Sequence, residues 1–193
     1  MSSIKLTADS GGGTFEIKAP SSSGNTRVLT IPDETATLLT SATSTGKILQ
    51  VVQATTTDVA SFSTSSSFVD GGLGATITPS AASSKILVQY RYATGQSAGN
   101  VRSTRLARSI NSGSYSEVTN VRAHAYAGNT QSTSQIHLID LTFLDTPSYS
   151  LGQPVAYRVE VNSYNTTLYR NQYGAGTGMG AMISTMILME VAA

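Results

Sequence analysis

The chain has 193 residues, no cysteine, no tryptophan and a formal net charge of +1 from 12 basic and 11 acidic residues. This balance excludes generic electrostatic binding to nucleic acid, and the lack of cysteine excludes disulfides, thiol catalysis and thiolate metal sites. Serine and threonine occupy 54 positions, 28 and 26 respectively, and glycine occupies 17. Because straight-chain helix formers are scarce beside them, the composition predicts strands and tight turns rather than helices.

Hydrophobic residues make up 39% of the chain and fall in periodic blocks, which indicates a folded protein rather than a disordered one. No apolar run approaches the roughly 20 residues that cross a bilayer, and the first residues lack the hydrophobic segment of a signal peptide. We therefore expect a protein that is made in the cytoplasm and does not insert into a membrane.

The first 45 residues contain three short apolar runs, at 4–6, 15–18 and 27–31, which predict three strands separated by turns. Strands this short cannot enclose a core alone, so we expect this N-terminal arm to pack on copies of itself. A break rich in serine and threonine then divides an arm of residues 1–45 from a domain of residues 46–193. The apolar side chains of the arm are the candidates for docking and trimer contacts: Ile4, Leu6, Phe15, Ile17, Val28 and Ile31.

The domain from residue 46 onward shows eight to ten strand signals in about 148 residues, which predicts an all-β fold, an antiparallel jelly-roll sandwich. Apolar and polar residues alternate at 85–92 and at 155–161, as in strands with one buried face.

Four further segments of the domain carry specific expectations. Residues 136–144 are apolar on both faces, which predicts a central strand, and residues 182–191 predict a C-terminal strand within a sheet. Residues 101–110 fit either a helix or a strand, of which we favour the strand. Residues 111–114 then predict a hairpin turn.

Several segments of the chain are similar to one family of virion proteins. The sequences IKLTADSGGGTFEIKAP at 4–20 and RVLTIPD at 27–33 resemble the opening of tail-fibre-like appendage proteins of tailed phages, particularly phages of cyanobacteria. The resemblance continues through GKILQVVQ at 46–53, TPSAASSKILV at 78–88 and ILMEV at 187–191. It implies a virion structural protein, a homotrimer, with a C-terminal jelly roll in the style of tumour-necrosis-factor-like trimers. An arm of about 45 residues is too short for a long shaft and fits a docking collar better.

A segment near the C-terminus mixes tyrosine with asparagine and arginine, the side chains that stack on sugar rings and bond their hydroxyls. It predicts a patch for a host-surface glycan or receptor. Its residues are Tyr164, Asn165, Tyr169, Arg170, Asn171 and Tyr173. The alternative is that the tyrosines lie at a subunit interface and the asparagines make turns, and we favour this alternative.

Other chemistry has weaker support in the sequence. The glycine-rich run at 174–180 lacks the lysine of a phosphate loop and fits a flexible connection better. A basic group of Arg102, Arg105, Arg108 and Arg122 either faces an acidic surface or pairs with carboxylates such as Glu117. The only plausible metal ligands are His124 and His137 with Asp140 or Asp145, and nothing in their spacing defines a site, so we expect no metal and no cofactor. A glycan-cleaving pair such as Asp140 with Glu160 is the least favoured alternative.

These observations lead to one expected function and two alternatives. We expect a non-enzymatic, homotrimeric phage virion protein that docks by its arm on another virion component, at the tail, a vertex or the major capsid protein. Its jelly roll would then face outward for host-surface attachment. The first alternative is a trimeric capsid decoration or cement protein, and the second is a glycan-cleaving tailspike enzyme. A chain with 12% charged residues suits strands packed on copies of themselves, although a monomeric sandwich is also compatible with it.

Overall fold

The computed structural model describes residues 3–7, 10–12, 14–18, 22, 24, 47–64, 67–96, 101–126, 136–164, 166–172 and 182–192. The chain divides into two compact units, Met1–Thr40 and Ser41–Ala193, and each is described by itself. Among the described residues, no helix has the length and apolar character needed to cross a membrane.

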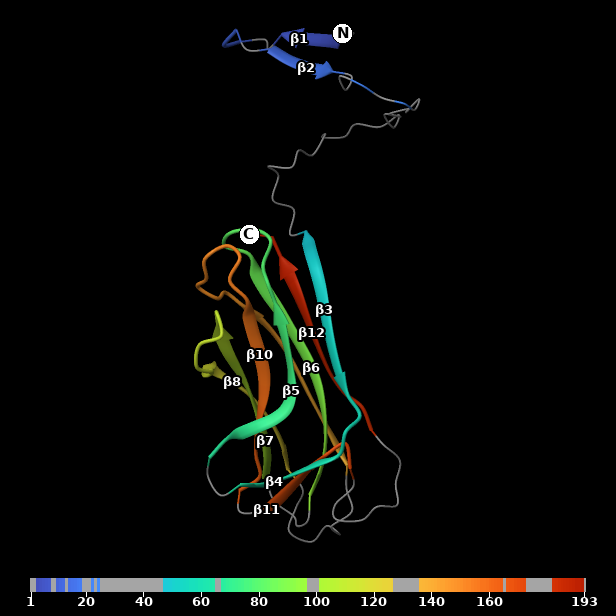
Figure 1. Ribbon diagram of the computed structural model, residues 1–193, viewed down its shortest axis with the longest axis vertical. Helices are drawn as coiled ribbons and strands as arrows, with labels where there is room; N and C mark the ends of the chain where they lie inside the picture. The colour runs from blue at the N-terminus through green and yellow to red at the C-terminus, as the bar shows by residue number, and fades with distance from the viewer. Residues whose placement is uncertain are drawn as a thin grey trace. The chain divides into compact units, whose positions relative to one another are not determined.

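The first unit contains a short antiparallel hairpin (Figure 1). Strand β1 (Ser3–Thr7) pairs with β2 (Thr14–Lys18). Two glycines with positive φ, 84° at Gly11 and 65° at Gly12, make the turn between them. These strands confirm the first two that the sequence predicts.

The rest of the arm remains a prediction. The third expected strand, with Val28 and Ile31, lies outside the described residues. The docking role expected for Ile4, Leu6, Phe15 and Ile17 is likewise untested.

The second unit holds ten strands in its described part, within the range that the sequence predicts (Figure 1). Their bounds in chain order are β3 (Ile48–Thr56), β4 (Ala60–Thr64), β5 (Val69–Ile77), β6 (Lys85–Gln96), β7 (Val101–Ile110), β8 (Ser116–Tyr126), β9 (His137–Asp145), β10 (Val155–Asn162), β11 (Thr166–Arg170) and β12 (Ser184–Val191).

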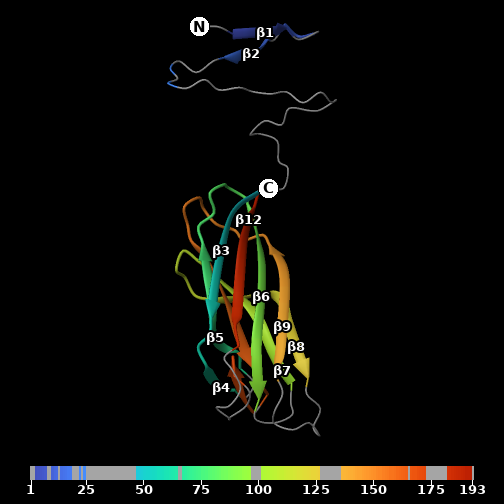
Figure 2. The ribbon, with the colours of Figure 1, turned by 90° about the vertical axis from the view of Figure 1, so that its right-hand side faces the viewer.

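These strands form two antiparallel sheets whose order defines a jelly roll. One sheet has the order β5-β10-β7-β8. The other runs β3-β12-β6, with β9 on β6 as well, and Figure 2 shows these four strands side by side. Apart from the short pair β4 and β11, the eight long strands are ordered 1-8-3-6 and 2-7-4-5 in chain sequence. Two interlocked Greek keys of this kind make a jelly-roll sandwich, as the sequence predicts.

The core lies between the two sheets and is built by the strands whose alternation was evident in the sequence. From β6, Ile86, Val88, Tyr90 and Tyr92 point inward and are at most 3% exposed. Four side chains of β10 meet them from the opposite sheet and are all 0% exposed: Val155, Tyr157, Val159 and Val161. Period-two alternation therefore located the buried face of both strands correctly.

Residues 101–110 form a strand, β7, and not a helix. Arg102 and Arg108 take inward positions, which breaks the apolar alternation and explains the ambiguous pattern. The predicted hairpin turn follows, with positive φ of 51° at Asn111 and 59° at Ser112.

Strand β12 lies between β3 and β6, which confirms the prediction for the C-terminus. The prediction that residues 136–144 form a central strand is wrong, because within the described residues β9 pairs only with β6. Its outward side chains Leu138 and Leu144 are 46% and 45% exposed. The strand is therefore apolar on both faces although only its inward face is buried within this chain.

A buried carboxylate ties the last strand to the loop between β5 and β6. The side chain of Glu190 in β12 is 0% exposed. Its oxygens accept hydrogen bonds from the amides of Ser80 and Ala81, at 2.9 and 3.1 Å, and from Nε2 of Gln50, at 2.7 Å. Burial alone raises the pKa of Glu190, but the Ser80 amide, the Gln50 side chain and other donors outweigh it and hold the pKa below its ordinary value of 4.5.

This cluster predicts an acid-sensitive contribution to stability that depends on Glu190. Because the pKa is lower in the folded chain than in the unfolded one, the contribution is complete above about pH 4.5 and disappears as the pH falls through the folded-state pKa. Thermal unfolding followed by circular dichroism will show Glu190→Gln less stable than the wild type at pH 7, with a smaller difference at pH 3. The exposed variant Asp58→Asn controls for the loss of one negative charge, and a difference that is constant with pH would contradict the prediction.

Candidate functional site

The outer face of the β3-β12-β6-β9 sheet carries a row of aliphatic side chains across all four strands. In the register, Met189 of β12 is paired with Val51 of β3 and with Leu87 of β6, and Leu87 is paired with Leu144 of β9. The two ends of the row are open, since Val51 is 58% and Leu144 is 45% exposed. We call these four residues the aliphatic row.

Two polar rows follow the aliphatic row along the same strands, at steps of two residues. The first step brings Gln53, Ile187, Gln89 and Thr142 side by side. The next step brings Thr55, Thr185, Arg91 and Asp140 together. Over β12, β6 and β9 the sheet surface is hollowed into an open depression of about 330 Å³, and the polar groups of these three strands line it together with Ile187. Along about 14 Å of strand, the side chains on this face therefore change from aliphatic groups to amide and hydroxyl groups and then to charged groups.

The row and the depression suit the binding of a partner better than catalysis. Exposed aliphatic side chains in a continuous patch mark interaction surfaces, because their burial against a partner removes apolar area from water. In the sequence, the aliphatic row was not recognised as a site. The signal was present in β9 and β12, whose runs are apolar at successive positions and so place large side chains on both faces.

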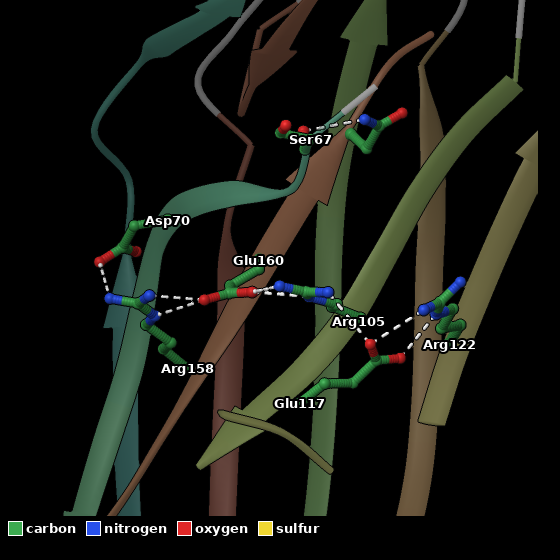
Figure 3. Close-up of polar contacts among 8 residues, drawn as sticks. Ser67, Asp70, Arg105, Glu117, Arg122, Arg158 and Glu160 are labelled. Carbon is green, nitrogen blue, oxygen red and sulfur yellow. Dashed lines mark hydrogen bonds and ion pairs between the residues drawn. The ribbon is translucent and has the colours of Figure 1, made fainter. Parts of the chain in front are cut away.

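The outer face of the opposite sheet has a different chemistry, a line of alternating charges that crosses β5, β10, β7 and β8 (Figure 3). We call it the charge ladder. Its members in spatial order are Asp70, Arg158, Glu160, Arg105, Glu117 and Arg122.

The centre of the ladder is Glu160, which is 4% exposed and lies between two guanidinium groups. Nε of Arg105 donates to its Oε2 at 2.6 Å, and Nε of Arg158 donates to its Oε1 at 3.0 Å. At one end, Glu117 accepts from Nη1 of Arg105 at 3.0 Å and from Nε of Arg122 at 2.6 Å. The hydrogen bond from Arg122 is the main reason that the pKa of Glu117 is below its ordinary value.

Aromatic rings cover the guanidinium groups of the ladder. The Arg105 guanidinium carbon lies 4.5 Å from the ring centre of Phe68, and that of Arg158 lies 4.0 Å from the ring centre of Tyr115. Three carboxylates and three guanidinium groups thus neutralise each other. Of the two alternatives for the basic group in the sequence, pairing with carboxylates holds for Arg105 and Arg122, which share Glu117, and for Arg108, which pairs with Asp145.

The two remaining arginines of that basic group point into the sandwich. Arg102 is 2% exposed, and Arg108 donates through Nη1 to Asp145 at 2.6 Å. Tyr157 donates its hydroxyl to the same carboxylate at 2.6 Å. Neither arginine contributes to an external cationic surface.

The segment predicted to bind a glycan is divided by the structure. Tyr164 is 60% exposed, with a positive φ of 41°, and Tyr169 in β11 is partly buried. Arg170 and Asn171 are 7% and 0% exposed, and their side chains hold backbone carbonyl groups. Asn165 and Tyr173 lie outside the described residues.

The burial of Arg170 and Asn171 corrects the predicted glycan patch. Nη1 of Arg170 donates to the carbonyls of Gly71 and Gly72, both at 2.8 Å, and Nδ2 of Asn171 donates to the carbonyl of Thr56 at 2.8 Å. These two side chains join strand ends inside the fold, so they are not available to a sugar.

The alternative catalytic and metal residues are spread over the fold. Asp140 faces outward from β9, whereas Glu160 faces outward from β10 in the opposite sheet, so the two carboxylates do not form a glycan-cleaving pair. Nδ1 of His124 lies 2.7 Å from the Ser103 hydroxyl. Among the described residues, no group of three or more histidines, aspartates or glutamates is placed to hold a metal ion. The glycine-rich run at 174–180 lies outside the described residues.

Comparison with known proteins adds a distant likeness among solved structures. No protein-family model matches the chain, and neither does any curated protein. Among solved structures, the Eiger TNF of S. frugiperda is similar, with 12% sequence identity and a TM-score of 0.45. The match covers 74% of this chain and 93% of the Eiger chain. The jelly-roll assignment rests on the strand order and register of this chain.

The charge ladder predicts a large effect of removing its central charge. Glu160→Gln keeps the shape of the side chain but leaves two neighbouring guanidinium groups without a carboxylate between them. We expect the free energy of unfolding to fall by about 2 kcal/mol, less than for a wholly buried pair because both arginines are partly exposed. Urea unfolding at one protein concentration measures the change. Asp70→Asn, at the exposed end of the ladder, will lower the free energy of unfolding by about 0.5 kcal/mol. Equal losses of stability in the two variants would contradict the central role of Glu160 in the ladder.

Proposed function

We propose that this chain is a non-enzymatic structural protein of a phage virion, a homotrimer that docks by its N-terminal arm and displays its jelly roll for attachment to the host surface. The observation that carries the proposal is the contrast between the two outer faces of the sandwich. One face has its charges paired in the ladder, whereas the other leaves the aliphatic row uncovered.

The aliphatic row supports self-association of the jelly roll. Four aliphatic side chains in register across one sheet lose contact with water when a second copy covers them. The number of copies, three, comes from the resemblance to appendage proteins of tailed phages. In a cyclic trimer, each copy meets its two neighbours through two different patches of its surface, and we propose that the outer face of the β3-β12-β6-β9 sheet carries both.

The two units support the division of labour between docking and display. The arm holds a two-stranded hairpin, which is too small for a stable core of its own and therefore requires a partner surface. Another virion protein at the tail, a vertex or the capsid is the partner that the resemblance implies.

A trimeric capsid decoration or cement protein is the second candidate, and one observation favours it. Arg170 and Asn171 are taken up by backbone contacts, which leaves fewer polar groups for recognition of a host glycan. A decoration protein needs the trimer and the docking arm but no receptor site.

The trimer predicts a specific response to charge on the aliphatic row. The variant Leu87→Lys places a cation at the centre of the row, between Met189 and Leu144, and it will dissociate the trimer into monomers. The matched control Thr76→Lys, on the outer face of the other sheet, will leave the trimer intact. Sedimentation velocity distinguishes one chain of 20.1 kDa from three. A wild-type chain that sediments as a monomer would contradict the homotrimer.

The virion role is tested by labelling intact particles with an antibody against the jelly roll and viewing them by electron microscopy. Label at the tail supports host attachment, and label spread over the head supports decoration. Deletion of residues 1–40 will abolish incorporation into either location. Particles without label, or incorporation of the truncated chain at the wild-type level, would contradict the proposal.

A further inference from the structure

Arg91 and Asp140 form an ion pair on the outer face that also carries the aliphatic row. They are register partners between β6 and β9, and Nε of Arg91 donates to Oδ1 of Asp140 at 2.8 Å. Their side chains are 59% and 56% exposed. An ion pair this open to water stabilises its own chain very little.

Most of the bonding capacity of this pair remains unused. A guanidinium group carries five N–H donors, and a carboxylate has two acceptor oxygens. Among the described residues, the two terminal nitrogens of Arg91 and Oδ2 of Asp140 have no protein partner. This contrasts with the charge ladder on the opposite face, where Glu160 is bonded through both oxygens.

The surroundings of the pair show what kind of partner fits. Arg91 and Asp140 lie in a depression whose other walls are neutral, with the polar side chains Gln89, Thr142 and Thr185. The site carries one positive and one negative group, so it fits neighbours that carry the same two groups, with the guanidinium group facing the carboxylate of one neighbour and the carboxylate facing the guanidinium group of the other. The aliphatic row begins two register steps away and requires an apolar counterpart. A second copy of this chain supplies both.

We propose that Arg91 of each copy bonds Asp140 of the next copy, which closes a ring of three guanidinium groups and three carboxylates around the trimer axis. This inference rests on the homotrimer of the proposed function and adds the contact that selects its register. Covering the face removes water from Arg91 and Asp140, so their unused donors and acceptor must find partners across the interface. The aliphatic row supplies the apolar surface that is buried between copies, and the ring of guanidinium groups and carboxylates determines how the copies align.

The test uses two full-length chains of opposite charge reversal, Arg91→Asp and Asp140→Arg, each with a different tag. Each variant alone presents only like charges at every interface and will weaken trimer formation by at least about a hundredfold. In an equimolar mixture, trimers that contain both variants regain two complementary interfaces of three. We expect sedimentation and tag capture to show mixed trimers at concentrations where each variant alone is monomeric.

Mixing separates contacts between chains from contacts within a chain. Each variant retains its own like-charged pair after mixing, so a pair that acts only within the chain gives no rescue, and that result would overturn the inference. The control Arg122→Asp creates a like-charged pair with Glu117 on the opposite face and will leave the trimer intact. Circular dichroism confirms that each variant is folded.

The outcomes also distinguish this inference from the proposed function. A wild-type trimer that neither charge reversal weakens overturns the ring and leaves the trimer standing. A wild-type chain that is monomeric at all concentrations overturns both.

Discussion

A two-sheet sandwich can bury only one face of each sheet within its own chain, and the rest of this structure follows from that constraint. The inward faces of β6 and β10 meet in the core, which buried side chains of β5, β7, β8, β11 and β12 complete. The two outward faces must then be compatible either with water or with another molecule. The chain meets this requirement in two ways, with paired charges on one face and uncovered aliphatic side chains on the other.

Polar side chains inside the sandwich connect its strands and loops through hydrogen bonds. Glu190 fixes the loop between β5 and β6, and Arg170 with Asn171 holds carbonyl groups of β5 and β3. Asp145 accepts from both Arg108 and Tyr157. Each of these buried groups has its partners within the fold, as the cost of burying an unpaired charge requires.

The difference between the outer faces connects the fold to assembly. In the charge ladder, each charge is neutralised by its neighbours, which suits a surface that stays in water. The aliphatic row and the half-satisfied Arg91–Asp140 pair together suit a surface that meets its own copies. Under the proposed function, both an attachment protein and a decoration protein need a face for self-association, and in both proposals the arm, not the jelly roll, selects the position in the particle.

The sequence by itself determined the all-β class, the buried faces of β6 and β10, the hairpin after Ile110 and the place of the C-terminal strand within a sheet. These features depend on local alternation and turn chemistry, which neighbouring residues carry. Only the tertiary structure decided that β9 is at an edge, that Arg170 and Asn171 are buried, and that the aliphatic row exists. Each of these depends on pairing between residues far apart in the chain, as between Val51 and Met189, and no local pattern encodes which strand will be the neighbour.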